Sequence, residues 1–287
     1  MSRGSCRCLP PSSAAGGTAA RVTAVGDALA HVDAWAHLAD TFADEAYATP
    51  KGRVRTYVLH DQLLEHLPPA PATVLDVGGG AGHQSFPLAR AGYEVTLLDP
   101  SDAMLAKARA RLSGESPSVA SRVELVKGAG EDAESALEGR LFDVVCCHGV
   151  LMYQTAPSPL VASLCKRLAP GGLLSLMALN AKTMALRPAL ERRWADVLSA
   201  FDTKSEVGVL GVNTRADTVE NLSGLLRSSG VEPVAWYGVW LFSDLVDLAG
   251  TGEAEVAELA EAELRASRTD PYRQMSRVFH LLGRRLG

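Results

Sequence analysis

The amino-acid sequence predicts an α/β fold: a doubly wound, Rossmann-like, mostly parallel seven-stranded sheet with helices on both faces and a helical lid insertion. Three observations predict it. Short apolar runs alternate with segments of helical periodicity from residue 73 onward. The first run ends in the glycine-rich turn Gly78–Gly82, which permits a tight passage from strand to helix. The second run ends in Asp99, 23 positions after Asp76.

Seven apolar runs have the lengths of single strands. They cover residues 73–78, 94–98, 123–126, 142–147, 173–179, 231–237 and 276–282. Helical periodicity is found over residues 83–91, 101–112, 217–229 and 253–267. Because crossovers between parallel strands are right-handed, a ligand is expected at the carboxyl ends of the strands.

The segments around this core differ from it in composition. Residues 1–30 are rich in Ala, Gly, Ser and Pro, and we predict a disordered extension there. Residues 31–287 form the predicted domain, which opens with an amphipathic helix over His31–Tyr47. Thr49–Gly52 is expected to break this helix, and a second helix is expected over residues 53–67. Residues 180–216 are the predicted lid, with a loop at 204–214.

The composition excludes several classes of protein. Hydrophobic residues make up 47% and charged residues 21% of the 287 residues, which is typical of a globular domain. A net charge of −5 gives no general basic surface for nucleic acid, which weakens an RNA partner without excluding one. No apolar run reaches the roughly 18 residues of a membrane span, so we expect no membrane contact. Cys6 and Cys8 lack the second ligand pair of a zinc site, so we expect no metal and a reducing, cytoplasmic location.

The spacing of the glycine turn indicates the cofactor. A dinucleotide fold has G-x-G-x-x-G and places a pyrophosphate at the helix N-terminus. Here an acidic residue precedes a shorter glycine pattern, which resembles the first motif of class I methyltransferases dependent on S-adenosyl-L-methionine (SAM). SAM has no phosphate, and its ammonium makes a nearby carboxylate useful. The predicted cofactor residues at this turn are Asp76, Gly78, Gly79, Gly80 and Gly82, and Asp99 is expected to accept from the ribose diol.

Other polar residues are predicted at the same edge of the sheet. Arg55, in the first turn of its helix, can hold the SAM carboxylate. The loop after the third strand can contact adenine through Gly130, Glu131 and Asp132, although an acidic residue there also commonly caps the next helix. His148 ends the fourth strand and is predicted to contact the cofactor or to act as a general base with a pKa near 6.5. Tyr153 is a candidate for the reaction site and the substrate entrance, with core packing as the alternative.

Several stretches resemble the bacterial tRNA 5-carboxymethoxyuridine methyltransferase family. They are Tyr47–Arg55, Leu75–Gly82, Asp99, His148–Leu151, Leu176–Ala181, Asp270–Tyr272 and Arg277–His280. The resemblance implies SAM contacts from Arg55, Gly78, Gly79, Asp99, Gly130, Glu131 and His148. It also implies transfer of a methyl group to an oxygen of a modified wobble uridine, with the tRNA anticodon loop as partner.

Two departures from the family pattern favour a less charged acceptor. Trp240 and Ser243 stand where the family tends to carry an arginine and a histidine, and residues 202–214 lack its lysine-rich run. We predict that Trp194, Trp240 and Ser243 help to bind the acceptor. A small metabolite or natural-product intermediate is therefore the alternative acceptor, and a non-catalytic SAM-binding protein is a further alternative.

Overall fold

The computed structural model describes residues 47–208 and 212–287. The predicted extension at 1–30, the C-x-C pair and all but the last residue of the predicted helix at 31–47 lie outside these ranges. No helix in the described ranges is both long enough and apolar enough to span a membrane.

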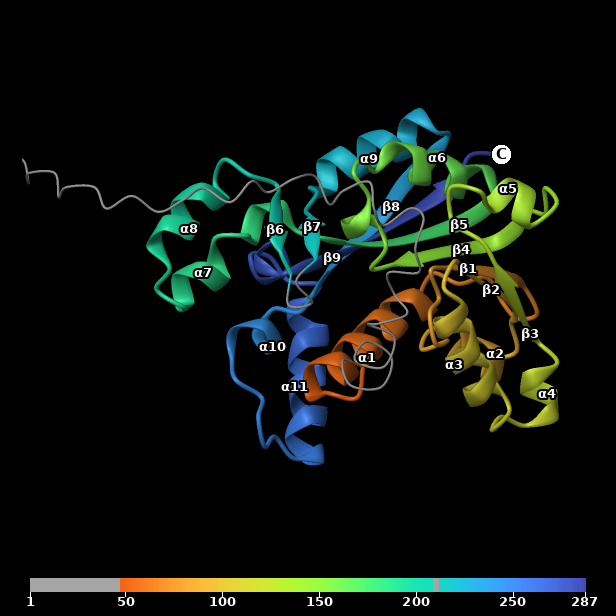
Figure 1. The fold of residues 1–287 in the computed structure, drawn as a ribbon, viewed down its shortest axis with the longest axis horizontal. Helices are drawn as coiled ribbons and strands as arrows, with labels where there is room; N and C mark the ends of the chain where they lie inside the picture. The colour runs from red at the N-terminus through yellow and green to blue at the C-terminus, as the bar shows by residue number, and fades with distance from the viewer. Residues whose placement is uncertain (1–46, 209–211) are drawn as a thin grey trace, which may run out of the picture. The chain divides into compact units, whose positions relative to one another are not determined.

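A sheet of seven strands organises the described part of the chain, in the order β3-β2-β1-β4-β5-β9-β8 (Figure 1). β9 is antiparallel to both neighbours, and the pairs from β3 to β5 are parallel. This order confirms the predicted doubly wound fold. The strands are β1 (Thr73–Val77), β2 (Glu94–Asp99), β3 (Val123–Lys127), β4 (Phe142–His148), β5 (Leu168–Leu179), β8 (Val231–Val239) and β9 (Val278–Arg285).

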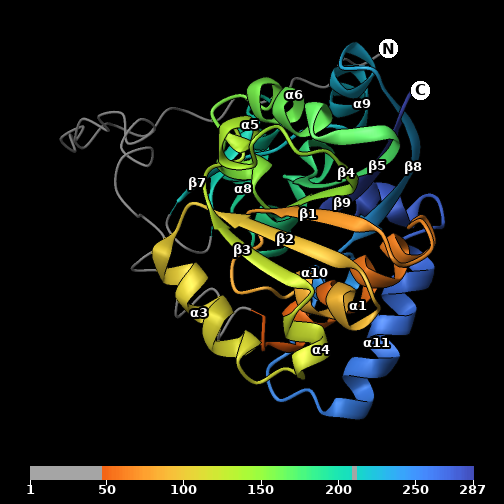
Figure 2. The ribbon, with the colours of Figure 1, turned by 90° about the vertical axis from the view of Figure 1, so that its right-hand side faces the viewer.

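Helices cover both faces of the sheet (Figures 1 and 2). On one face, α5 (Ala133–Ala136), α6 (Ser158–Lys166) and α9 (Val219–Ser228) pack on a cluster that includes Cys147. On the other, α1 (Pro50–Leu64) and α2 (Ser85–Arg90) pack on a cluster that includes Cys146. Neighbouring residues of β4 thus serve opposite cores, as the alternation of a strand requires. The other helices are α3 (Asp102–Leu112), α4 (Pro117–Ala120), α10 (Phe242–Leu245) and α11 (Glu253–Ala266), with short 3-10 turns at Leu151–Tyr153 and Tyr272–Met275.

Helix α1 begins earlier than predicted, and the expected break at Thr49–Gly52 is its N-terminus. The Thr49 hydroxyl accepts from the Gly52 amide over 3.1 Å, and Pro50 opens the helix, where a missing N–H costs nothing. Arg55 therefore lies in the second turn and not in the first. Not all large apolar residues of this helix face the core, since Tyr57 and Leu64 are each 44% exposed.

The predicted lid is only partly helical. Two short helices, α7 (Leu186–Leu190) and α8 (Trp194–Ala200), follow a 3-10 turn at Ala181–Thr183. The predicted loop at 204–214 is wrong, because β6 (Ser205–Val207) and β7 (Asn213–Arg215) pair as an antiparallel ribbon. Arg215 anchors this ribbon by donating to the carbonyls of Leu151 and Gln154 over 3.2 and 3.0 Å. The sequence of a three-residue strand is too short to show a periodic pattern. The position of this ribbon is determined by its tertiary contacts.

β5 also begins earlier than predicted, at Leu168, which pairs with Phe142 before a bulge. Pro170, Gly171 and Gly172 therefore lie within the first half of β5, where its pairing with β4 is irregular.

We expect Phe279→Ala to destabilise the fold by about 3–5 kcal/mol, because its fully buried side chain packs in the core beside β5 and α9. Leu286→Ala, at a position 63% exposed, is the control and should cost less than about 0.5 kcal/mol. Urea denaturation of both variants measures the difference. Equal midpoints would contradict the assignment of this core.

Candidate functional site

The glycine turn closes onto the carboxylate of Asp99, at the carboxyl end of β2. The Gly80 amide donates to Asp99 Oδ2 and the Ser101 amide to Oδ1, each over 2.9 Å. The Gly78 amide reaches the carbonyl of Leu98 over 2.7 Å. These bonds fix the orientation of the carboxylate. A carboxylate has about four lone-pair sites, so it can serve amides and ligand hydroxyls together.

The turn requires glycine for backbone reasons at two positions. Gly78 has φ +68°, and a Cβ there would lie 2.3 Å from Cγ2 of Val150. Gly82 has φ +81°, and a Cβ there would lie 2.6 Å from the ring of Phe86. Both conformations are unfavourable for other residues. Larger side chains would therefore displace the backbone of the turn.

Asp76 supports the turn from the interior. It is 2% exposed, and its Oδ2 accepts from the Ser85 hydroxyl over 2.6 Å. A Cβ on Gly79 would lie 2.9 Å from the same oxygen. Burial raises the pKa of Asp76 to about 6, with a smaller contribution from Asp99. This placement gives Asp76 a positioning role beneath the turn.

Arg55 is a buried cation next to the same edge. It is 8% exposed, and its Cζ lies 5.1 Å from the centroid of the Tyr47 ring. No carboxylate in the described residues forms an ion pair with it. The guanidinium acts electrostatically on Asp76, His148 and Tyr153, so these groups form one cluster. A buried guanidinium without a carboxylate partner is suited to hold a ligand anion.

Tyr153 lies in the short turn after β4 and is partly buried. Burial, together with Tyr47, raises its pKa to about 12, so the phenol is protonated at neutral pH. It can therefore donate a hydrogen bond to a ligand but cannot act there as a base.

His148 belongs to a buried hydrogen-bond chain that sets its tautomer. The Gln62 amide donates through Nε2 to the Gly238 carbonyl, so its Oε1 accepts from Nδ1 of His280, over 2.9 Å. His280 Nε2 must then accept from the Ser175 hydroxyl, over 2.7 Å. Ser175 Oγ in turn accepts from Nε2–H of His148, over 2.7 Å.

This hydrogen-bond chain leaves the lone pair of His148 on Nδ1, a buried atom with no hydrogen-bond partner within residues 47–208 and 212–287. The expected pKa near 6.5 is wrong. Burial, and then the neighbouring His280 ring and Arg55 guanidinium, which disfavour a second positive charge, hold the pKa of His148 well below its usual range. The imidazole is thus neutral at pH 7: it is a good hydrogen-bond acceptor but a weak base.

The predicted adenine loop follows β3. Gly130 is buried, and a Cβ there would lie 2.5 Å from Cδ1 of Leu160. Its carbonyl accepts from the Ser163 hydroxyl over 2.7 Å. Glu131 and Asp132 are exposed. Asp132 stands at the start of α5, but its side chain makes no capping bond.

The predicted acceptor residues do not share one surface. Trp194 is 63% exposed, on a helix in which no residue is buried. Trp240 is partly buried and donates through Nε1 to the Lys51 carbonyl over 3.0 Å. Ser243 is 2% exposed, and its hydroxyl donates to Oε1 of Glu263 over 2.5 Å. Ser243 is therefore buried, and both its amide and its hydroxyl are hydrogen-bonded to Glu263.

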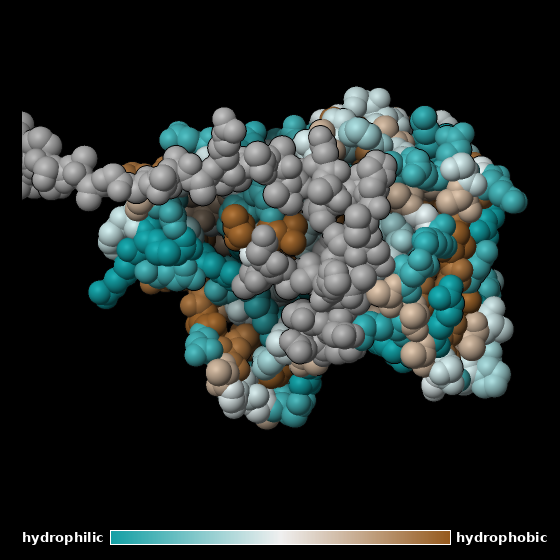
Figure 3. All heavy atoms as spheres, in the orientation of Figure 1, coloured by the Kyte–Doolittle hydropathy of each residue, from teal (hydrophilic) through white to brown (hydrophobic). Residues whose placement is uncertain are grey.

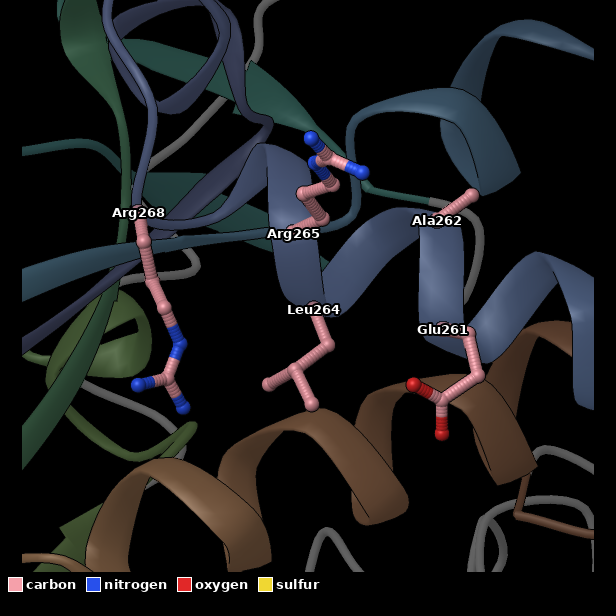
Figure 4. A pocket seen from close by; sticks show the side chains of 5 residues that line it. All are labelled: Glu261, Ala262, Leu264, Arg265 and Arg268. Atoms are coloured by element: carbon pink, nitrogen blue, oxygen red, sulfur yellow. The ribbon is translucent and has the colours of Figure 1, made fainter.

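Two hollows lie away from this cluster. One, of about 520 Å³, is lined by α11 and the residues after it (Figure 4). The other, of about 360 Å³, lies at the amino ends of β1 and β2. Neither contains a predicted site residue. The described ranges hold no group of three or more His, Cys, Asp and Glu side chains that could bind a metal.

The sequence analysis did not predict a site role for three residues of the His148 hydrogen-bond chain: Gln62, Ser175 and His280. A signal was present, because Ser175 and His280 interrupt apolar runs that are read as buried strands. A polar residue in such a position needs a hydrogen-bond partner. The pairing of β5 with β9, which brings the two together, is a long-range contact that the runs alone do not specify.

Comparison with known proteins adds the chemistry. Residues 75–174 match a family described as "Methyltransferase domain". The chain is similar to the tRNA 5-carboxymethoxyuridine methyltransferase of Escherichia coli (strain K12), with 28% identity over 86% of this chain and 94% of that protein. It also resembles the ubiquinone biosynthesis O-methyltransferase of Xanthomonas axonopodis pv. citri (strain 306), with 36% identity over 40% of this chain and 46% of that protein.

Solved structures share the fold. The CcbJ methyltransferase of Streptomyces caelestis aligns with a TM-score of 0.57 and 18% identity, over 87% of this chain and 96% of that one. Magnesium protoporphyrin IX methyltransferase of Synechocystis PCC 6803, solved with bound SAM, aligns with a TM-score of 0.58 and 14% identity, over 93% and 100%. Residues 75–174 thus carry a methyltransferase domain, and a relative matched over most of the chain is a methyltransferase. The predicted enzyme class is confirmed.

We expect the raised pKa of Asp76 to make stability depend on pH. The folded methyltransferase binds a proton on Asp76 below about pH 6, whereas the unfolded chain binds it only near pH 3.8. Stability should therefore fall as the pH rises through this window, by roughly 3 kcal/mol at most. Asp76→Asn keeps an acceptor for Ser85 and should remove this component. Urea denaturation from pH 4 to 7 tests it, and parallel curves for the two proteins would contradict it.

Proposed function

We propose that this methyltransferase transfers a methyl group from SAM to an oxygen of a modified wobble uridine in tRNA. The observation that carries the proposal is the extent of the match to the Escherichia coli tRNA enzyme, 94% of which is covered. The match therefore includes segments outside residues 75–174, where acceptor specificity is expected to lie. A match confined to the common domain would support only the cofactor.

The residues at the carboxyl edge fit SAM in three respects. Arg55 is a buried cation with no carboxylate partner among the described residues, and it can hold the amino-acid carboxylate. The fixed carboxylate of Asp99 can accept from the ribose hydroxyls. Nδ1 of His148 is a buried acceptor without a partner, suited to a ligand N–H or O–H group. When bound, SAM supplies a methyl group activated by a sulfonium.

The neutral state of His148 favours an acceptor that is already ionised. A carboxylate needs no proton removed, so this chain has only to orient it and exclude water. A hydroxyl acceptor would need a base, and the lowered pKa of His148 makes its imidazole a weak one. We therefore favour the carboxylate form of the modified uridine as acceptor.

A second candidate is a small-molecule acceptor. Trp240 and Ser243 take the place of charged residues, and the ubiquinone enzyme is 36% identical over the part that matches. The net charge of −5 also disfavours a broad RNA-binding surface. The same cofactor residues would serve this reaction, so only the acceptor separates the two candidates.

Variants of the cofactor cluster should affect SAM binding in graded fashion. Asp99→Ala is expected to abolish measurable binding, because both the diol contact and the clamp on the glycine turn are lost. Arg55→Ala should weaken SAM by about 1.5–3 kcal/mol, the range for a charge-assisted bond. Arg53→Ala, two positions away and exposed, is the matched control and should bind as the wild type does. Calorimetry measures the dissociation constants, and unchanged binding by Arg55→Ala would contradict the carboxylate contact.

The identity of the methyl acceptor can be tested both in vivo and in vitro. Nucleoside mass spectrometry of tRNA from a deletion strain should show loss of a methylated wobble uridine, and purified enzyme with SAM should restore it. An unaltered profile would remove tRNA as acceptor and leave the small-molecule candidate.

A further inference from the structure

We propose that Arg277, Arg187 and Lys51 form a subsite for an oxyanion of the methyl acceptor, either a carboxylate or a phosphate. The inference rests on the proposed function, because it assigns the acceptor side of the same enzyme. These three cations are called the cation cluster below.

The cation cluster lies at the edge of the sheet that carries the cofactor residues. Leu179, the last residue of β5, pairs with Val278, so Arg277 lies beside the carboxyl end of β5. The Arg277 amide donates to the Trp240 carbonyl over 2.8 Å, and its carbonyl accepts from Asn180 over 3.0 Å. Both backbone polar groups of Arg277 are therefore bonded, which fixes its backbone at this edge.

A cluster of apolar side chains lies beside Arg277. Met177, Leu179, Val239 and Val278 form a buried cluster, with Met152 and Trp240 packed against it. Met177 also pairs with His148 across the β4–β5 ladder. The apolar cluster thus runs along the sheet edge from the strand pair that carries His148 to the one that carries Arg277. On the face shown in Figure 3, hydrophobic side chains gather between the insertion and the part formed by α10 and α11.

The cation cluster carries more positive than negative charge. Lys51 and Arg187 both pair with Asp244, whose side chain is 4% exposed. Arg277 pairs through Nη2 with Glu206 on β6. Among the described residues, these three cations therefore share two carboxylates. The pKa of Lys51 is lowered by burial and then by Arg187 and Arg277, against the opposing effect of Asp244. Burial followed by Arg187 lowers the pKa of Arg277 to about 10.

A nearby carboxylate, that of Glu263, does not neutralise the excess positive charge of the cation cluster. Glu263 lies behind α10, where it accepts from the amides of Leu241 and Ser243 and from the Ser243 hydroxyl. It is not among the charges that act on Lys51 or Arg277. Its carboxylate serves the turn into α10.

The decisive observation is an unsatisfied donor. Arg277 Nη1 is buried, in a side chain that is 8% exposed, and it has no hydrogen-bond partner among the described residues. A buried charged donor without a partner is costly, so such a group generally has a function or a ligand. An oxyanion would satisfy Nη1 and neutralise the excess charge together. An acceptor with an apolar ring and an anionic substituent matches this combination of surfaces.

The test measures binding of inorganic phosphate, and separately of acetate, to the full-length protein at constant ionic strength. SAM is present at saturation, so that Arg55 is occupied. Arg277→Gln should weaken the apparent dissociation constant at least about tenfold, as expected for loss of a charge-assisted bond. Glu206→Gln breaks the same ion pair but frees Nη2, so it should tighten binding by about threefold or more. Arg193→Gln, at an exposed arginine of the insertion, should change nothing.

Opposite effects of Arg277→Gln and Glu206→Gln would support the subsite, and equal losses or no change in either would overturn it. Preference for acetate over phosphate assigns the subsite to a carboxylate, and the reverse preference assigns it to a phosphate.

Methylation of tRNA is measured in parallel. Under the proposal, Arg277→Gln raises KM for tRNA while the dissociation constant of SAM stays unchanged. An unchanged KM would overturn the subsite and leave the proposed function standing. If the wild type methylates no tRNA but the phosphate pattern holds, the tRNA function fails and the anion subsite stands.

Discussion

The clamp between the glycine turn and Asp99 is the constraint on which the cofactor side of this methyltransferase depends. Two amides, from Gly80 and Ser101, hold one carboxylate. The Gly80 contact joins the turn after β1 to the end of β2, and the Ser101 contact orients the carboxylate from the residues that follow β2. Asp76, buried beneath it, and the close packing of Gly78 on Val150 maintain the same geometry from the other side. The turn is thus held by backbone amides bonded to the Asp99 carboxylate and by a second carboxylate, Asp76, buried beneath it.

The sequence predicts this side well because its determinants are local. Apolar runs of strand length specify β1 to β5, and glycines with positive φ occur where the turn needs them. The acceptor side depends on contacts between distant residues. The β6–β7 ribbon exists because Arg215 bonds to the chain near Leu151, and Ser243 is internal because Glu263 saturates it. Such contacts leave no periodic pattern in the sequence.

The two sides of the edge have opposite electrostatic character. On the side proposed for the cofactor, the structure brings together the Asp99 carboxylate, the buried Arg55 guanidinium and a neutral His148. On the acceptor side, positive charge exceeds negative charge around an apolar floor. A neutral His148 between them adds no charge to either. This division is consistent with a reaction in which an anionic acceptor approaches a cationic donor.

The double role of the segment around β9 limits how the sequence of this enzyme can diverge. Arg277 precedes this strand and His280 lies within it, so the same short segment serves the cation cluster and the tautomer of His148. Any alteration of its register would disturb both. Arg187 and Glu206, by contrast, belong to the insertion, whose helices and ribbon contribute little to the core. Divergence toward acceptors of different charge is therefore expected to accumulate in the insertion, with β9 as the invariant element of the lineage.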